Sequence, residues 1–300
     1  MDATATILPD DLVTAAWLRD HLLEPGLQVI DIRGYVKSID LDGGRQQASY
    51  TAAFDEYEHG HIPGAVFIDW TRDIVDLENP VKAQIAGPDR FAEILGRSGV
   101  DAGTDVVVVD HSGGHFATRL WWAFRYYGHE RVAILEGGFN GWTDAGLPIE
   151  MGIHTAESRT FMASVRPELG SDADDVRTMV KTGARQIVDA RDPETFSGAL
   201  QRGSRGGHIP TAVNLPARDL MEADGRWKHP DAIRAAAAVA GVDVDRPVTA
   251  YCNGGVTATA VLFGLHRAGL ADFSNYDGSW NEWGERVDLP VEGNRDLWSK

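Results

Sequence analysis

Two patterns of hydrophobic and polar residues alternate along the chain, and both occur in each half. Apolar residues that recur every three or four positions predict amphipathic helices at 10–23, 89–99, 172–183 and 231–241. Short runs rich in β-branched residues predict strands at 29–33, 105–110, 187–191 and 247–251. Such alternation is typical of an α/β fold, so we expect parallel sheets flanked by helices on both faces.

The chain contains an internal duplication. The segment 29–33 ("VIDIR") recurs as 187–191 ("IVDAR"), and the turn 60–66 ("GHIPGAV") recurs as 207–213 ("GHIPTAV"). Residues 110–142 match residues 251–283 at a constant offset of 141 positions, which sets His111 opposite Cys252. Because duplicated units fold alike, we predict two tandem α/β domains, at 1–150 and 171–300, joined by a linker at 151–170.

The first half has extra residues between its strand and its turn. Asp31 and His61 are 30 positions apart, whereas Asp189 and His208 are 19 positions apart. The additional residues centre on 37–49, a polar stretch that either lies in solvent or reaches the site of the other domain. Since surface loops tolerate insertion, we favour the solvated loop.

Composition limits the classes of function. The formal net charge of -17 repels phosphate backbones, so we expect no nucleic-acid partner. No stretch approaches eighteen uninterrupted apolar residues, so we expect no membrane association. A single cysteine permits no intramolecular disulfide, and residues 1–30 show no targeting pattern, so we expect a cytoplasmic protein.

Cys252 lies between a predicted strand and a predicted helix, at the carboxyl end of the strand, where open α/β sheets bind ligands. Two adjacent glycines follow it, and glycines that adopt positive φ turn backbone N–H groups inward as an anion-binding nest. The positive end of the helix dipole also stabilises a thiolate there. We therefore predict that Cys252 is a nucleophile. Its binding loop comprises Asn253, Gly254, Gly255, Val256 and Thr257.

Other interpretations of the loop remain open. A cysteine that merely packs at a strand end needs no flanking glycines. A phosphatase or arsenate reductase uses a similar loop but needs an arginine six positions after the cysteine, where this chain has Ala258. A non-catalytic module that relays a persulfide from a partner would use the same loop without turning over small donors.

The duplication, both "GHIP" turns, residues 117–142 and the loop "CNGGVTA" at 252–258 together resemble the two-domain rhodanese-type sulfurtransferases, the family of thiosulfate and 3-mercaptopyruvate sulfurtransferases. The resemblance covers essentially the whole chain. It implies a non-catalytic N-terminal domain, which agrees with His111, and a catalytic C-terminal domain. It also implies a ping-pong reaction in which Cys252 takes a sulfane sulfur as a persulfide and passes it to a thiol, cyanide or a thioredoxin-like acceptor. No metal or organic cofactor is implied.

Two departures from the family pattern leave the donor open. Thiosulfate enzymes typically show Cys-Arg-Lys-Gly-Val-Thr and mercaptopyruvate enzymes Cys-Gly-Ser-Gly-Val-Thr, whereas Asn253 and Gly254 stand at the variable positions here. Because neither residue is cationic, we expect a modest preference for 3-mercaptopyruvate. The arginine that the family places before Phe/Tyr-x-Gly is replaced by Thr195, so Arg202 and Arg205 are the nearest candidates to bind the substrate anion.

Further side chains are candidates for the site. Arg191 ends the repeated Asp-x-Arg motif, which favours a structural ion pair, but we retain it as a possible substrate contact. His61 is a candidate for proton transfer, and Trp280 is a candidate wall of the pocket. His111 and His115 flank two glycines and lack a third ligand nearby, so we predict no metal site.

Overall fold

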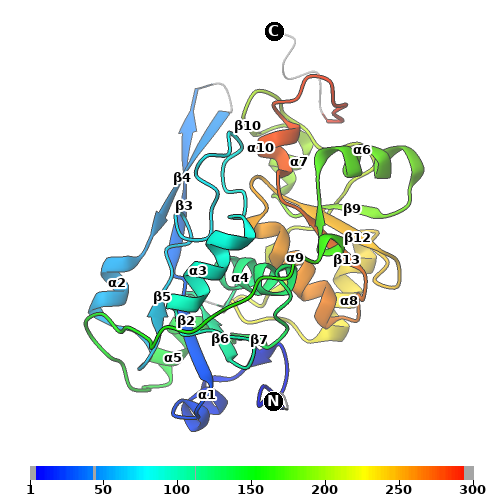
Figure 1. Ribbon diagram of the computed structural model, residues 1–300. Coiled ribbons are helices and arrows are strands. Elements are labelled where there is room, and N and C mark those ends of the chain that lie inside the picture. The colour runs from blue at the N-terminus through cyan, green and yellow to red at the C-terminus, as the bar shows by residue number, and fades with distance from the viewer. Residues whose placement is uncertain (1–4, 43–44, 112, 294–300) are drawn as a thin grey trace.

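The computed structural model describes residues 5–42, 45–111 and 113–293, which form two α/β units with the same strand order (Figure 1). Each unit has a five-stranded parallel sheet, so the predicted fold class is confirmed. The first sheet runs in the order β1 (Leu12–Val13), β7 (Val132–Leu135), β6 (Asp105–Val109), β2 (Leu27–Asp31) and β5 (Val66–Phe67). The second runs β8 (Gly170–Ser171), β13 (Phe273–Tyr276), β12 (Val248–Tyr251), β9 (Gln186–Asp189) and β11 (Val213–Asn214).

Helices cover the two sheets. The first unit contains α1 (Ala15–His21), α2 (Phe54–His59), α3 (Pro88–Arg97), α4 (His115–Tyr126) and α5 (Gly138–Asp144). The second contains α6 (Ala173–Thr182), α7 (Pro193–Ser197), α8 (Pro230–Val239), α9 (Val256–Arg267) and α10 (Ser279–Trp283), with short 3-10 turns at Pro167–Leu169 and Ala217–Leu220. None of the described helices is long and apolar enough to cross a membrane.

The predicted helix at 10–23 is shorter than expected. Leu12 and Val13 instead pair with β7, because the helix begins only after Thr14. The Thr14 side chain accepts a hydrogen bond from the Trp17 N–H at 3.2 Å, which caps the first turn of α1. A β-branched capping residue thus separates a short strand from the helix.

The segment predicted as the linker carries no helix or strand from 151 to 166. It follows the surface of the first unit, where the Arg159 N–H donates to the Gly96 carbonyl at 2.8 Å and the Arg166 N–H donates to the Tyr126 carbonyl at 2.7 Å. The boundaries drawn from the sequence, at 150 and 171, stay a prediction.

Equivalent helices of the two units, α4 and α9, pack against each other at the centre of the molecule (Figure 1). The hydroxyls of Thr118 and Thr259, which the duplication aligns with each other, lie 3.1 Å apart. Trp121 of α4 packs edge-on against Phe263 of α9, with ring centroids 5.0 Å apart. One buried hydrophobic cluster therefore extends through both units and fixes their relative orientation.

The additional segment of the first half is a β-hairpin that pairs with the second unit. Strands β3 (Gly34–Leu41) and β4 (Arg45–Ala52) are antiparallel, and β4 pairs in parallel with β10 (Gln201–Arg202). Our expectation of a solvated loop at 37–49 is wrong, because β4 supplies backbone hydrogen-bonding groups to a strand of the other unit. The tip residues 43–44 lie outside the described residues.

Candidate active site

Cys252 follows directly after β12, and its side chain is almost fully buried, with 3% of the residue exposed. Its N–H donates to the Ser279 hydroxyl at 3.1 Å. The carbonyls of Cys252 and Asn253 accept hydrogen bonds from the N–H groups of Trp280 (3.0 Å) and Asn281 (2.8 Å). Residues at the start of α10 thus hydrogen-bond the backbone of Cys252 and Asn253 and hold this segment in place.

The loop after Cys252 turns at Gly255, which caps α9 in the left-handed region at φ 72°. A Cβ at this position would lie 2.7 Å from Asp277 Oδ1, so only glycine fits. Gly254 is not among the residues with positive φ, so the two adjacent glycines serve different purposes. The first N–H groups of α9 have no acceptor within the helix and are therefore available to an anion.

The equivalent loop of the first unit binds a carboxylate through its backbone amides. The Asp110 carboxylate accepts hydrogen bonds from the N–H groups of Gly113, Gly114 (3.1 Å), Phe116 (3.1 Å) and Ala117 (3.1 Å). By the repeat offset, these four amides correspond to those of Gly254, Gly255, Thr257 and Ala258. A carboxylate of the chain itself therefore fills the anion nest beside His111.

In the second unit, the place of Asp110 is taken by Tyr251, which carries no charge. Its hydroxyl accepts a hydrogen bond from the Ile209 N–H at 3.1 Å, away from the loop. Within the described part of the chain, no carboxylate accepts a hydrogen bond from the amides of Gly254, Gly255 or Thr257. The amide nest is thus occupied by a carboxylate in the first unit and open in the second.

A cavity of about 380 Å³ adjoins Cys252 and lies between the two units. Its wall contains two buried polar atoms without a hydrogen-bond partner, Arg191 Nη1 and Asn253 Oδ1. These two groups are therefore available to hydrogen-bond a polar ligand in the cavity. The lining residues are Gly34, Tyr35, Val36, Ser38, His115, Phe116, Ala190, Arg191, Asp192, Thr195, Arg202, Pro216, Ala217, Arg218, Cys252, Asn253 and Thr257.

Arg191 is held rigidly at this wall. Its guanidinium pairs with the buried Asp189 carboxylate at 2.6 Å, which confirms the expected ion pair, and donates to the Gly207 carbonyl at 2.7 Å. The guanidinium also lies over the Trp280 ring, 4.5 Å from its centroid. Burial alone would lower the pKa of Arg191, but the Asp189 carboxylate holds it above its ordinary value, so the group stays charged.

Arg202 reaches the cavity because the hairpin positions it. Its Nε donates to Gln46 Oε1 at 3.1 Å, and its Nη2 donates to the Ser38 hydroxyl. Both acceptors belong to strands of the first unit, whereas Arg202 belongs to β10 of the second. The pairing of β4 with β10 therefore brings a cation of one unit to the cavity through contacts with the other.

Three candidates from the sequence lie elsewhere. Arg205 donates four hydrogen bonds to backbone carbonyls within 283–289, which commits its guanidinium to the structure. His61 is fully buried against Tyr57 and does not line the cavity. Trp280 stands behind Arg191 and donates its Nε1–H to the Arg205 carbonyl at 3.1 Å. We therefore leave Arg205 and His61 out of the site and assign Trp280 to the support of Arg191.

The structure adds residues that the sequence did not reveal. His115 of α4 lines the cavity, and its Nδ1 lies 3.5 Å from the Thr257 hydroxyl. Tyr50 of β4 lies near Cys252: burial raises the pKa of its phenol, and the nearby cysteine adds to the shift. His111 is instead paired with Glu56 at 3.2 Å. Among the described residues, no group of three or more His, Cys, Asp or Glu side chains is placed to hold a metal ion.

Comparisons with known proteins identify similar chains. The rhodanese-like domain family matches residues 14–145 and 172–286. The chain is 35% identical over 283 residues to the 3-mercaptopyruvate sulfurtransferase of Escherichia coli K12, with 93% of this chain and 97% of that protein covered. It is 32% identical to the thiosulfate sulfurtransferase of Mus musculus, over 92% of each chain. The solved structure of SseA from Escherichia coli, a 3-mercaptopyruvate sulfotransferase, matches with a TM-score of 0.75 at 32% identity, over 90% of this chain and 98% of that one.

The different surroundings of the two loop glycines give a first prediction. Gly255→Ala should lower the free energy of unfolding by about 1–3 kcal/mol, because alanine disfavours the left-handed region and its Cβ meets Asp277. Gly254→Ala is the matched control, since its Cβ first meets the movable Asn281 side chain. Urea unfolding measures both, and equal losses of stability would contradict the assigned loop geometry.

Proposed function

This chain belongs to the rhodanese-like family and is a sulfurtransferase, and we propose that it carries sulfur from 3-mercaptopyruvate or thiosulfate to an acceptor through a persulfide on Cys252. One observation carries this proposal: the amide nest beside Cys252 is open, whereas its duplicate beside His111 is filled by the Asp110 carboxylate. The open nest accordingly suits a transient anion attached to the cysteine.

In the first step, the Cys252 thiolate attacks the transferable sulfur of the donor. With 3-mercaptopyruvate, a new S–S bond forms, the C–S bond breaks, and the enolate of pyruvate leaves and takes up a proton. With thiosulfate, the S–S bond of the donor breaks and sulfite leaves. Backbone N–H groups at the start of α9 stabilise the negative charge of the attacking sulfur and of the persulfide.

In the second step, an acceptor attacks the outer sulfur, the persulfide bond breaks, and the Cys252 thiolate is restored. We propose a small thiol, cyanide or a thioredoxin-like protein as the acceptor, and the cytoplasm as the compartment. The single cysteine supports a reducing compartment, because the chain cannot form an intramolecular disulfide. No further cysteine is needed to complete the cycle.

The donor's anionic end faces the arginines of the cavity. Arg191 offers Nη1, which is buried and has no hydrogen-bond partner among the described residues. Arg202 lines the same cavity, held by Ser38 and Gln46. Both therefore support binding of a carboxylate or a sulfonate-like group at a distance from the reacting sulfur.

The loop itself favours 3-mercaptopyruvate over thiosulfate. Asn253 lines the cavity directly beside Cys252 and brings no positive charge. A keto acid carries one negative charge at its carboxylate end, which the arginines compensate, whereas thiosulfate concentrates two charges near the cysteine. The amides alone compensate that second charge less completely.

Loading of sulfur on the protein tests the proposed reaction. After incubation with either donor, mass spectrometry of the wild-type protein should show an added mass of about 32 Da that cyanide removes, because the persulfide sulfur is electrophilic. Cys252→Ser should show no added mass and no turnover. Equal turnover by the wild type and this variant would exclude the proposal. Slow turnover of every small donor, together with rapid loading from a desulfurase, would favour the relay module.

Charge at position 253 should select the donor. Asn253→Arg should raise kcat/KM for thiosulfate relative to 3-mercaptopyruvate by about three- to tenfold at low ionic strength, because a cation beside Cys252 attracts a dianion more strongly. Added salt should reduce the change. Asn253→Gln is the neutral control and should leave the ratio unchanged. A salt-independent effect on both donors alike would show that this position does not select by charge.

A further inference from the structure

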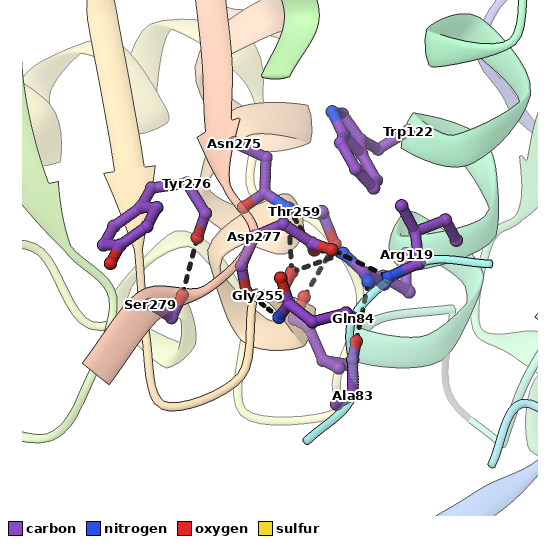
Figure 2. A network of polar contacts seen from close by, with 12 residues as sticks. Ala83, Gln84, Arg119, Trp122, Gly255, Thr259, Asn275, Tyr276, Asp277 and Ser279 are labelled. Atoms are coloured by element: carbon purple, nitrogen blue, oxygen red, sulfur yellow. Dashed lines mark hydrogen bonds and ion pairs between the residues drawn. The ribbon is translucent and has the colours of Figure 1, made fainter. Parts of the chain in front are cut away.

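Arg119 extends from α4 of the first unit to the cysteine loop of the second (Figure 2). It is buried, with 2% of the residue exposed. Its Nη1 donates to the Gly255 carbonyl at 3.2 Å and to the Asp277 carboxylate, and its Nη2 donates to the Ala83 carbonyl at 2.9 Å. The guanidinium therefore bridges three separate segments at the back of the loop.

The partners of Arg119 are fixed in turn. The Asp277 carboxylate accepts a hydrogen bond from the Ile85 N–H at 2.8 Å. The backbone carbonyl of Asp277 accepts one from the Gln84 side-chain amide at 2.9 Å. Asn275 donates a second hydrogen bond to the Gly255 carbonyl at 3.2 Å. Figure 2 shows these groups converging on Gly255 from both units.

Two physical consequences follow for the amide nest. Because a trans peptide is planar, its carbonyl and N–H point in opposite directions. Holding the Gly255 carbonyl toward Arg119 thus fixes the Gly255–Val256 peptide, which lies between the N–H groups of Gly255 and Thr257, two amides of the nest. In addition, the Asp277 carboxylate lies directly against the loop, since a Cβ on Gly255 would be 2.7 Å from Oδ1. An unpaired carboxylate there would repel a thiolate or persulfide.

We propose that Arg119 is a positioning residue for sulfur transfer, which neutralises Asp277 and holds the Gly255 turn so that the nest amides on either side of it, those of Gly255 and Thr257, accept the charge on Cys252. The inference rests on the proposed role of Cys252 as the nucleophile. It gives the first unit, which lacks a cysteine, a direct part in the reaction. The repeat places Ala260 opposite Arg119, so the filled nest beside His111 receives no equivalent cation from that position.

Other charged and titratable groups surround Cys252 and remain unchanged in the test. They lie on the cavity wall or close to it, whereas the Arg119–Asp277 pair lies behind the loop. These groups are Tyr35, His115, Arg191, Asp192, Arg202, Arg218 and Tyr50. A change made only behind the loop therefore isolates the contribution of the pair.

The single cysteine makes a direct test possible, because alkylation by iodoacetamide labels only Cys252. In Arg119→Gln, the midpoint of the pH profile of alkylation should move up by about one unit, which slows alkylation at pH 7 by up to about tenfold. In Arg119→Gln/Asp277→Asn, the midpoint should return to that of the wild type, since no unpaired carboxylate remains. Arg119→Lys should keep the wild-type midpoint.

Arg125→Gln is the matched control. Arg125 lies on the same helix, stacks over Trp121 at 4.8 Å as Arg119 stacks over Trp122 at 4.8 Å, and pairs with Asp11 at 2.8 Å, away from the loop. Its loss should lower thermal stability without moving the alkylation profile. If Arg119→Gln does the same, Arg119 is merely structural and the inference is wrong.

If Arg119→Gln does not fold, Asp277→Asn alone should move the midpoint down, because Arg119 then adds an uncompensated positive charge; an unchanged midpoint would overturn the inference. A double variant that stays shifted like Arg119→Gln would also overturn it. Sulfur loading of the wild-type protein is measured separately. If the wild type accepts no sulfur while the variants show these shifts, the proposed reaction is refuted, but the effect of Arg119 on the charge at Cys252 is not.

Discussion

Backbone N–H groups at the start of a helix have no hydrogen-bond partner within that helix, and the candidate site depends on this lack of partners. The duplicated strand-loop-helix unit produces this lack twice, before α4 and before α9. In the first unit, the Asp110 carboxylate accepts hydrogen bonds from these N–H groups and fills the nest. In the second, the Tyr251 hydroxyl bonds elsewhere and leaves the nest open beside Cys252, which is the basis of the proposed binding site.

The two units are interdependent at that site. The packing of α4 on α9 brings Arg119 behind the loop, and the hairpin of β3 and β4 brings Ser38 and Gln46 to Arg202 on the cavity wall. The first unit, which has no cysteine, thus supplies the Arg119 guanidinium behind the loop and part of the cavity wall. The first unit therefore contributes to the candidate site although its half of the sequence contains no cysteine.

The sequence predicted the repeated α/β units and the cysteine loop because both depend on local patterns: periodic apolar residues, and glycines beside a cysteine. It did not predict the hairpin, since 37–49 is polar and its pairing partner, β10, lies far along the chain. Local sequence also could not separate Arg202 from Arg205. Their environments differ through distant groups: carbonyls at 283–289 bind Arg205, whereas the hairpin directs Arg202 to the cavity.

The central claim is that the open amide nest holds the sulfur carried by Cys252. A crystal structure of donor-treated protein at a resolution that separates the two sulfur atoms tests it most directly. We expect a second sulfur bonded to Sγ, within hydrogen-bonding distance of N–H groups among residues 254–258, with the Asp110 nest unchanged. A second sulfur directed away from these amides, or sulfur bound without Cys252, would contradict the account.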